Sequence, residues 1–394
     1  MKKLLQFAAG LMLVAQLASA QDSRITNDGG TWVHDVSGTL ASAKNLRVTV
    51  DAGSVKVEGG DQQEIRYAMH NRAPGASEEK ARRNFDAYKV TANVRGDTAY
   101  LVAEWQGGGN RRFSGDFSIN VPRNIESVSV ETGGGGVTAS HLGGRVDIET
   151  GGGQLRVEDV KGAVHAQTGG DNVEIASVGD LNLQTGGGRV SLRDIRGTMN
   201  ASTGGGDVLL ISSEKGGVLE TGGGNIQVQQ CGGKLKVSTG GGNIDIGDVV
   251  GAIEIETGGG SIRVGSAKGF VRAETGAGRI ELNGIPGGQA ETGSGTIVAK
   301  LISMQGGNQA TTLETGSGDV VVYLDPALHI SVRAAIDMAN GHTISSDFSE
   351  IKVVTEGGEW GPQSVSAQGG LNGGGPMLKM STASGNIQIK RASR

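Results

Sequence analysis

The sequence predicts an all-β fold: a parallel β-solenoid (β-helix) wound from a single chain, with about 18 residues per turn and irregular capping ends. Three observations carry this prediction. A Thr-Gly phrase recurs at nearly fixed spacing, apolar residues keep fixed offsets from it, and polar and apolar residues alternate between the phrases. Self-similarity at a fixed period is the signature of a stacked repeat architecture.

The recurring phrase supplies the frame of the repeat. It occurs eleven times, in steps of 18 residues with two steps of 17 and a final one of 23. A disordered chain would not keep such a register. Each threonine has the inward parity of its strand, so we predict a buried methyl group and a hydroxyl bonded to the bent backbone. These repeat threonines are Thr132, Thr150, Thr168, Thr185, Thr203, Thr221, Thr239, Thr257, Thr275, Thr292 and Thr315.

Apolar columns follow each threonine. In the repeat of Thr239 they contain Ile244 and Ile246, then Val249, and finally Ile255 just before the next threonine. The alternation around them has the period of two that is typical of half-buried strands. Each repeat is therefore predicted to hold two short strands and a corner segment. One such unit buries too little apolar surface to offset its ordering entropy, so units must stack, and the crossover rule favours a right-handed coil.

The glycine runs have three interpretations. A phosphate-binding loop needs a strand-to-helix junction and a Gly-Lys-Ser/Thr sequence, which no run provides. Calcium-binding nonapeptide repeats need an aspartate at a fixed place after the glycines, but that column contains Arg156, Leu209 and Arg263. We therefore interpret the glycines as corners of the coil, where φ is positive or where a side chain would clash with the adjacent turns.

Residues 1–20 have the features of a Sec-type signal peptide. Lys2 and Lys3 precede an apolar stretch that ends in Ala18-Ser19-Ala20. The stretch is shorter than the roughly 20 residues of a membrane-spanning helix, and no later stretch is apolar enough for an integral membrane segment. The sequence thus predicts export to the periplasm, the extracellular space or the cell surface, with a mature chain that starts at Gln21.

Three regions are predicted in the mature chain. Residues 21–120 form a β-rich region of irregular first turns with one short helix, which is capped by Ser77 and carries Ala81, Phe85 and Tyr88 on one face. Residues 121–325 form the regular β-solenoid. Residues 326–394 form an excursion from the coil and a closing turn, in which Thr382 returns to the repeat frame.

Charge and cysteine content narrow the function classes. Without Lys2 and Lys3, 34 basic residues stand against 41 acidic ones, a net charge of −7. This balance argues against nucleic acid as a partner. Cys231 is the only cysteine, so no intramolecular disulfide forms, and its inward column predicts a buried, inert thiol.

Candidate sites on the repeats are weak. Glu256, Glu274 and Glu291 share one outward column, which is either a weak cation-binding or partner face, or a row of solvated charges that keeps the sheet from pairing with other chains. Catalysis would need acids gathered with a base or a metal on one face, and the six histidines share no column. We therefore predict no enzyme, no catalytic residues, no cofactor and no dedicated metal site.

Several phrases together resemble one known family. LRVTVDAGSVKVEG, FSINVP before VETGGGG, LETGSGDVVVYLD and MSTASGNIQI are similar to segments of the DUF4097 family, bacterial β-strand-repeat proteins named as adhesins. The resemblance covers nearly all of the mature chain and supplies no catalytic residues to carry over. We expect an exported, non-enzymatic β-solenoid of the cell envelope, an adhesin-like binding or structural module whose partner is an envelope protein or a glycan. The alternatives are a carbohydrate-active β-helix enzyme and an envelope scaffold that self-associates end to end.

Overall fold

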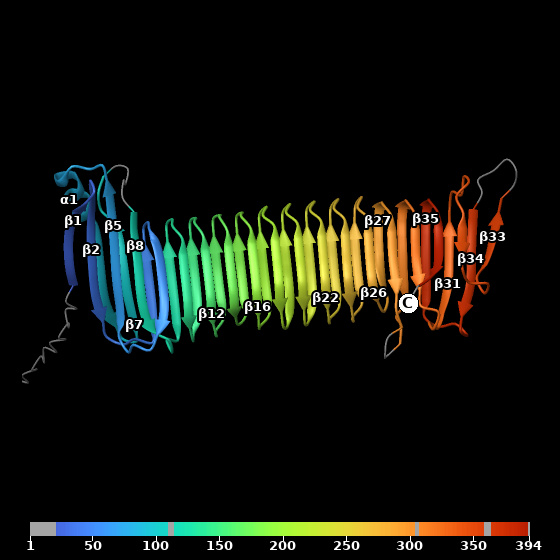
Figure 1. The fold of residues 1–394 in the computed structure, drawn as a ribbon, viewed down its shortest axis with the longest axis horizontal. Coiled ribbons are helices and arrows are strands. Elements are labelled where there is room, and N and C mark those ends of the chain that lie inside the picture. The colour runs from blue at the N-terminus through green and yellow to red at the C-terminus, as the bar shows by residue number, and fades with distance from the viewer. Residues whose placement is uncertain (1–20, 109–113, 304–306, 358–363, 393–394) are drawn as a thin grey trace, which may run out of the picture.

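The computed structural model describes residues 21–108, 114–303, 307–357 and 364–392. Within these ranges the chain forms one helix and 36 strands in two sheets of 18 strands each, here sheet A and sheet B. The strands stack along a rod (Figure 1), and their inward side chains form one continuous core. The predicted β-solenoid is therefore confirmed. The predicted signal peptide, residues 1–20, lies outside the described residues.

In the regular part of the rod the chain alternates between the sheets. The strands of sheet A there are β10 (Val137–Leu142), β12 (Leu155–Val160), β14 (Val173–Val178), β16 (Val190–Ile195), β18 (Val208–Ser213), β20 (Ile226–Cys231), β22 (Ile244–Val249), β24 (Ile262–Ala267), β26 (Ile280–Ile285), β28 (Ile297–Leu301) and β30 (Val320–Leu324). The strands of sheet B are β9 (Ser127–Thr132), β11 (Arg145–Thr150), β13 (Val164–Thr168), β15 (Leu181–Thr185), β17 (Met199–Thr203), β19 (Gly216–Thr221), β21 (Lys234–Thr239), β23 (Ile253–Thr257), β25 (Val271–Thr275), β27 (Gly288–Ser294) and β29 (Thr311–Ser317). Each regular turn contributes one strand to each sheet.

The repeat threonines form one unbroken row in sheet B. Parallel pairing joins each of them to the next, from Thr132 to Thr315, and then to Thr382. The irregular steps leave this row intact because they fall at the corner after a strand of sheet A. That corner is one residue shorter in the turns that lead to Thr185 and Thr292, and it is longer between Leu301 and Thr311, in the turn that leads to Thr315.

The third apolar column does not form a separate corner segment, contrary to the sequence-based expectation. Val249 and its equivalents are the last residues of the sheet A strands. Ile246 and Val249 are both buried although they lie three positions apart, so one extra residue interrupts the alternation between them. In five turns the residue just before this column has a positive φ, between 52° and 61°: His141, Asp159, Ser177, Asp194 and Gly284.

The glycine run at the other corner is required by close packing more than by positive φ. A Cβ on Gly240 or Gly242, the first and third glycines after Thr239, would collide with a carbonyl oxygen of the preceding turn. A Cβ on the middle residue, Gly241, would meet nothing within 4 Å. Accordingly, the middle position is also occupied by other small residues, namely Ala277, Ser294 and Ser317. The run is thus two tight positions around one open position.

In most turns the threonine hydroxyl links consecutive corners. Thr239 Oγ1 donates to the carbonyl of Gly224 in the preceding turn at 2.8 Å and accepts from the amide of Gly242 in its own corner at 3.3 Å. The same two bonds occur at Thr221, Thr257 and Thr275. A single buried side chain therefore satisfies backbone groups of two turns.

We expect Thr239→Val to destabilise the protein by about 1–2 kcal/mol, because valine keeps the shape of threonine but leaves the buried Gly224 carbonyl and Gly242 amide without this partner. Urea unfolding followed by circular dichroism measures the change. Ser238→Ala, at the half-exposed neighbouring position, is the control and should leave the midpoint unchanged. An unaltered midpoint for Thr239→Val would show that the hydroxyl is dispensable.

The N-terminal end widens each sheet with antiparallel strands. Outward from β10, sheet A continues through β4 (Ser54–Gly60), β8 (Ser114–Pro122), β5 (Ile65–Pro74), β2 (Thr31–Leu40) and β1 (Gln21–Asp28). Outward from β9, sheet B continues through β3 (Asn45–Val50), β7 (Thr98–Trp105) and β6 (Tyr88–Arg95). The predicted helix is α1 (Glu78–Ala87), which starts after the N-cap Ser77 and buries Ala81 and Phe85. This helix lies at the N-terminal end of the rod (Figure 1).

The C-terminal end is built out of sequence order. Outward from β29, sheet B continues through β35 (Met377–Ser384), β31 (Ile330–Ile336), β34 (Ser364–Leu371) and β33 (Lys352–Glu356). Outward from β30, sheet A continues through β36 (Ile387–Arg391) and β32 (Ile344–Ser346). The turn that returns to the repeat frame at Thr382 is therefore not outermost, because the excursion stacks beyond it.

Candidate functional site

The predicted acidic column lies on the outer face of sheet B. Glu256, Glu274 and Glu291 are neighbours in β23, β25 and β27, and Glu314 continues the row. Arg272 Nη2 lies 2.6 Å from Glu274 Oε1, so a cation of the chain itself neutralises part of the column. Among the residues that the structure describes, no group of three or more His, Cys, Asp or Glu side chains is placed to hold a metal ion.

Other charges on the regular turns form similar exposed pairs. Lys236 Nζ lies 3.1 Å from Glu254 Oε1 on the next turn, and both side chains are more than 40% exposed. The hydrogen bond from Lys236 lowers the pKa of Glu254. Such exposed pairs contribute little to stability because water and salt screen them. These faces therefore present repeated solvated charges and no distinct convergent site.

Cys231 is the last residue of β20, and its side chain points into the core. It is 2% exposed, and its Sγ donates to the Gly233 carbonyl at 3.5 Å. Burial raises the pKa of the thiol, which disfavours the reactive thiolate. The thiol thus packs as a small apolar group.

We expect Cys231 to resist a thiol reagent at neutral pH in the folded protein and to react at once in guanidinium chloride. The physical reason is the combination of burial and a raised pKa. Absorbance of the released thiolate from an aromatic disulfide reagent gives the rate. Equal rates in the two conditions would contradict the buried position.

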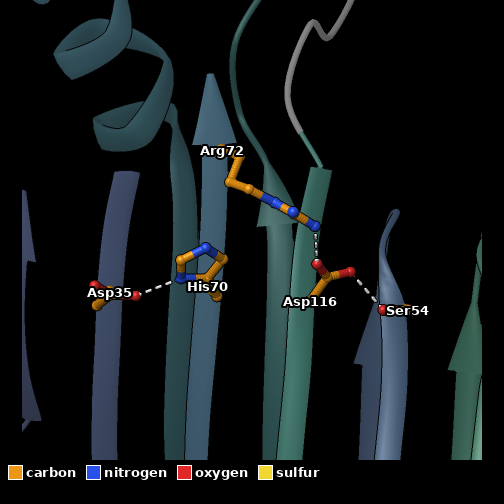
Figure 2. A network of polar contacts seen from close by, with 5 residues as sticks. All are labelled: Asp35, Ser54, His70, Arg72 and Asp116. Carbon is orange, nitrogen blue, oxygen red and sulfur yellow. Dashed lines mark hydrogen bonds and ion pairs between the residues drawn. The ribbon is translucent and has the colours of Figure 1, made fainter. Parts of the chain in front are cut away.

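One polar network departs from the repeat frame, on the outer face of the N-terminal part of sheet A. It crosses four neighbouring strands and is shown in Figure 2. His70 Nδ1 lies 2.6 Å from Asp35 Oδ1, and Arg72 Nη2 donates to Asp116 Oδ2 at 2.6 Å. Ser54 Oγ donates to the other oxygen of Asp116 at 2.5 Å. All four charged or ionisable side chains stay at least 40% exposed, so they are accessible from solvent.

Directly behind this network lies a buried polar position. Asn71 is fully buried between His70 and Arg72 in the strand, and its side-chain amide has no hydrogen-bond partner among the described residues. A Cβ on the paired residue Gly115 would collide with the Asn71 Oδ1, so glycine there makes room for the amide. The strand β5 thus carries polar groups on both faces at this point.

His34 is the inner-face partner of Asn71 on β2. Its ring centroid lies 5.2 Å from that of Phe85 on α1, and its Nε2 lies 2.8 Å from Ser23 Oγ. Burial lowers the pKa of His34, against the smaller opposite effect of Asp86 and Asp35. The folded state therefore favours a neutral imidazole.

We expect the N-terminal end to lose stability as the pH falls below about 6.5, the ordinary pKa of histidine. In that range the unfolded chain takes up a proton on His34 that the folded chain does not, so lower pH favours unfolding. Hydrogen exchange of residues 21–108 between pH 7.5 and 5.5 measures the effect. His34→Gln should reduce this pH dependence, and an undiminished dependence in the variant would assign it to other groups.

The sequence did not reveal the polar network. Its residues lie on four strands of the irregular region, and His70 and Arg72, two positions apart in β5, are the one pair of them related by a regular spacing. The threonine and glutamate columns were found because the repeat fixes their positions, whereas the network is created by antiparallel pairing between β2, β5 and β8. The nearest signal was the change of composition in residues 21–120.

Comparisons with known proteins find weak similarity to a few solved structures. No protein-family model matches the sequence, and no curated protein matches it. Among solved structures, a Clostridium sporogenes protein whose name assigns it to cell adhesion is 10% identical, with 95% of this chain and 100% of that chain covered and a TM-score of 0.17. A Parabacteroides distasonis protein named as an adhesin is 12% identical, with 74% of this chain and 93% of that chain covered and a TM-score of 0.23. A second protein from that organism, named for lipid binding, is 10% identical, with 93% and 98% covered and a TM-score of 0.19.

Scores this low carry no argument about the function of the chain. The structure adds one further observation: none of the helices that it describes has the length and apolar character needed to cross a membrane.

Proposed function

We propose that this protein is an exported, non-enzymatic β-solenoid of the cell envelope that acts as an adhesin-like binding module. The N-terminal polar network of Asp35, Ser54, His70, Arg72 and Asp116 is its binding surface. The observation that supports this proposal is the convergence of these five side chains from four strands, outside the repeat frame. The resemblance of the sequence to the DUF4097 family and the features of residues 1–20 point the same way.

The chemistry of the network suits a polar partner. A guanidinium, two carboxylates, an imidazole and a hydroxyl offer donors and acceptors side by side on an exposed sheet, and charged groups form the stronger hydrogen bonds. The partner is an envelope protein or a glycan, both rich in amide or hydroxyl groups. The flat faces of the regular turns then act as a spacer that holds this surface at one end of a rod.

The experiment compares two arginine variants of the mature protein. Arg72 and Arg272 each contact one carboxylate at 2.6 Å, and their side chains are 52% and 51% exposed, so they are matched. Binding to immobilised envelope glycans and envelope proteins is measured for the wild type, Arg72→Gln and Arg272→Gln. We expect Arg72→Gln alone to lose binding. Equal binding by both variants would show that the network is not the binding surface.

A separate assay tests the absence of catalysis. The protein is incubated with a panel of bacterial polysaccharides, and new reducing ends and unsaturated products are measured. We expect neither product. Formation of either would favour the carbohydrate-active enzyme instead.

A further inference from the structure

The C-terminal end of sheet B finishes in an exposed strand. β33 pairs only with β34, in antiparallel register, and all five of its residues are exposed. Val353 and Val354 are 43% and 49% exposed, two of the few large apolar side chains on the surface. Figure 1 shows this strand at the C-terminal end of the rod, far from the polar network. Its other edge offers backbone groups that no described strand uses.

The sequence of β33 is complementary to itself when one copy runs antiparallel to another. It reads Lys-Val-Val-Thr-Glu, from Lys352 to Glu356. In a pair centred on Val354, Lys352 of each copy lies opposite Glu356 of the other. On β34 these two residues face Gln368 and Ser364, which are uncharged, and neither has an ion-pair partner within 4 Å among the described residues. Both charges are thus available for a second copy.

The other sheet edges are less suited to pairing with their own copies. On β1 a pair centred on Thr26 would match Arg24 of each copy with Asp28 of the other, but β1 has no exposed large apolar side chain to pack at the centre of such a pair. The only charged residues of β6 are Lys89 and Arg95, so two copies would repel each other. β32 is three residues long, too short to template a stable pairing. Of the edges described, β33 alone combines matched opposite charges with exposed apolar side chains at the centre of the pair.

We propose that β33 is the interface of a symmetric dimer, in which two rods join end to end by antiparallel pairing of β33 with β33 of a second copy. Sheet B then runs without interruption from one rod to the other. The twofold axis passes through the Val354 pair, so the assembly closes at two copies.

The shape of the rod end permits this pairing. In sheet B, β34 and β33 lie beyond β31, whereas sheet A ends at β32, the strand of the same turn. Sheet B therefore overhangs sheet A by two strands, and the ends of the two A sheets stay apart when β33 pairs. One five-residue strand buries less area than the roughly 1,600 Å² of a standard interface, so we expect a weak, concentration-dependent dimer.

Cysteine cross-linking of the full mature protein tests the register. Opposite residues of an antiparallel pair have Cα atoms about 4.5–5.5 Å apart, within the range of a disulfide. Val354→Cys should therefore form a disulfide-linked dimer on mild oxidation. In the same register Val353 lies opposite Thr355, so Val353→Cys and Thr355→Cys should each stay monomeric alone but cross-link when mixed. The native Cys231 is buried and serves as the unreactive background.

Charge exchange tests the same register without covalent capture. Sedimentation of the wild type over a range of concentrations should show monomer and dimer. Lys352→Glu and Glu356→Lys should each abolish the dimer, because like charges then face each other, and the double exchange should restore it. A monomer at every concentration, dimers in both single variants, or species larger than a dimer would each overturn the proposal. None of these outcomes depends on the proposed binding surface at the other end.

Discussion

Replacing Gly242 with alanine is expected to destabilise the protein by about 3 kcal/mol. The added Cβ would collide with the Gly224 carbonyl of the preceding turn and lies close to the backbone of Asn225. Neither group can move away alone, because both belong to a backbone that is hydrogen-bonded to the turns on either side. The clash must therefore separate two turns in the middle of the rod. Urea unfolding measures the loss, and hydrogen exchange of residues 208–260 locates it.

Gly241→Ala is the matched control for this corner. A Cβ there would meet nothing within 4 Å, and φ at this residue is outside the left-handed region. We expect no loss, or a gain of roughly 0.5 kcal/mol because alanine restricts the unfolded chain. If both substitutions destabilise equally, the corner needs glycine for a reason other than packing between turns.

Replacing Phe85 with alanine is expected to cost about 3–5 kcal/mol at the N-terminal end. Phe85 is 1% exposed and, with Ala81 and Ala73, forms the small core between α1 and the antiparallel part of sheet A. A cavity there removes the main contact of the helix with the end of the rod. We expect faster hydrogen exchange in residues 21–108 and unchanged exchange in residues 208–285, because a solenoid turn contacts only its neighbours.

Val250→Ala is the control for this substitution, since Val250 is 53% exposed and packs little. It should leave exchange unchanged in both regions. Equal acceleration along the whole rod in Phe85→Ala would show that the rod unfolds as one cooperative unit, and the local interpretation would fail.

The regular turns were predictable because the same constraint acts in each of them. A side chain at Ile255 must face the core and stack on its equivalents, so its column appears in the sequence many times over. The bulged end of the sheet A strands was not predictable from periodicity. Val249 keeps the apolar character of an inward residue in either geometry, and only the extra residue in the backbone distinguishes a strand from a corner.

The two ends were predictable in composition but not in topology. Antiparallel pairing of β5 with both β2 and β8 depends on long-range contacts between unrelated segments, which no local pattern encodes. The network built on these strands was unpredictable for the same reason. The helix was an exception, because Ser77 and the spacing of Ala81 and Phe85 are local signals.

The position of β35 between β29 and β31, and of β36 between β30 and β32, has a consequence for how the chain is made. Residues 330–371 are synthesised before the turn on which they stack, so β31 has no place to dock until residues 377–391 follow. A chain cut before residue 377 would therefore not be a shorter rod with an intact cap. It would be a rod that ends at β29 and β30, where both sheets have an unpaired edge, and the excursion would not be docked on it. The C-terminal cap can therefore form only after the ribosome has synthesised residues 377–391.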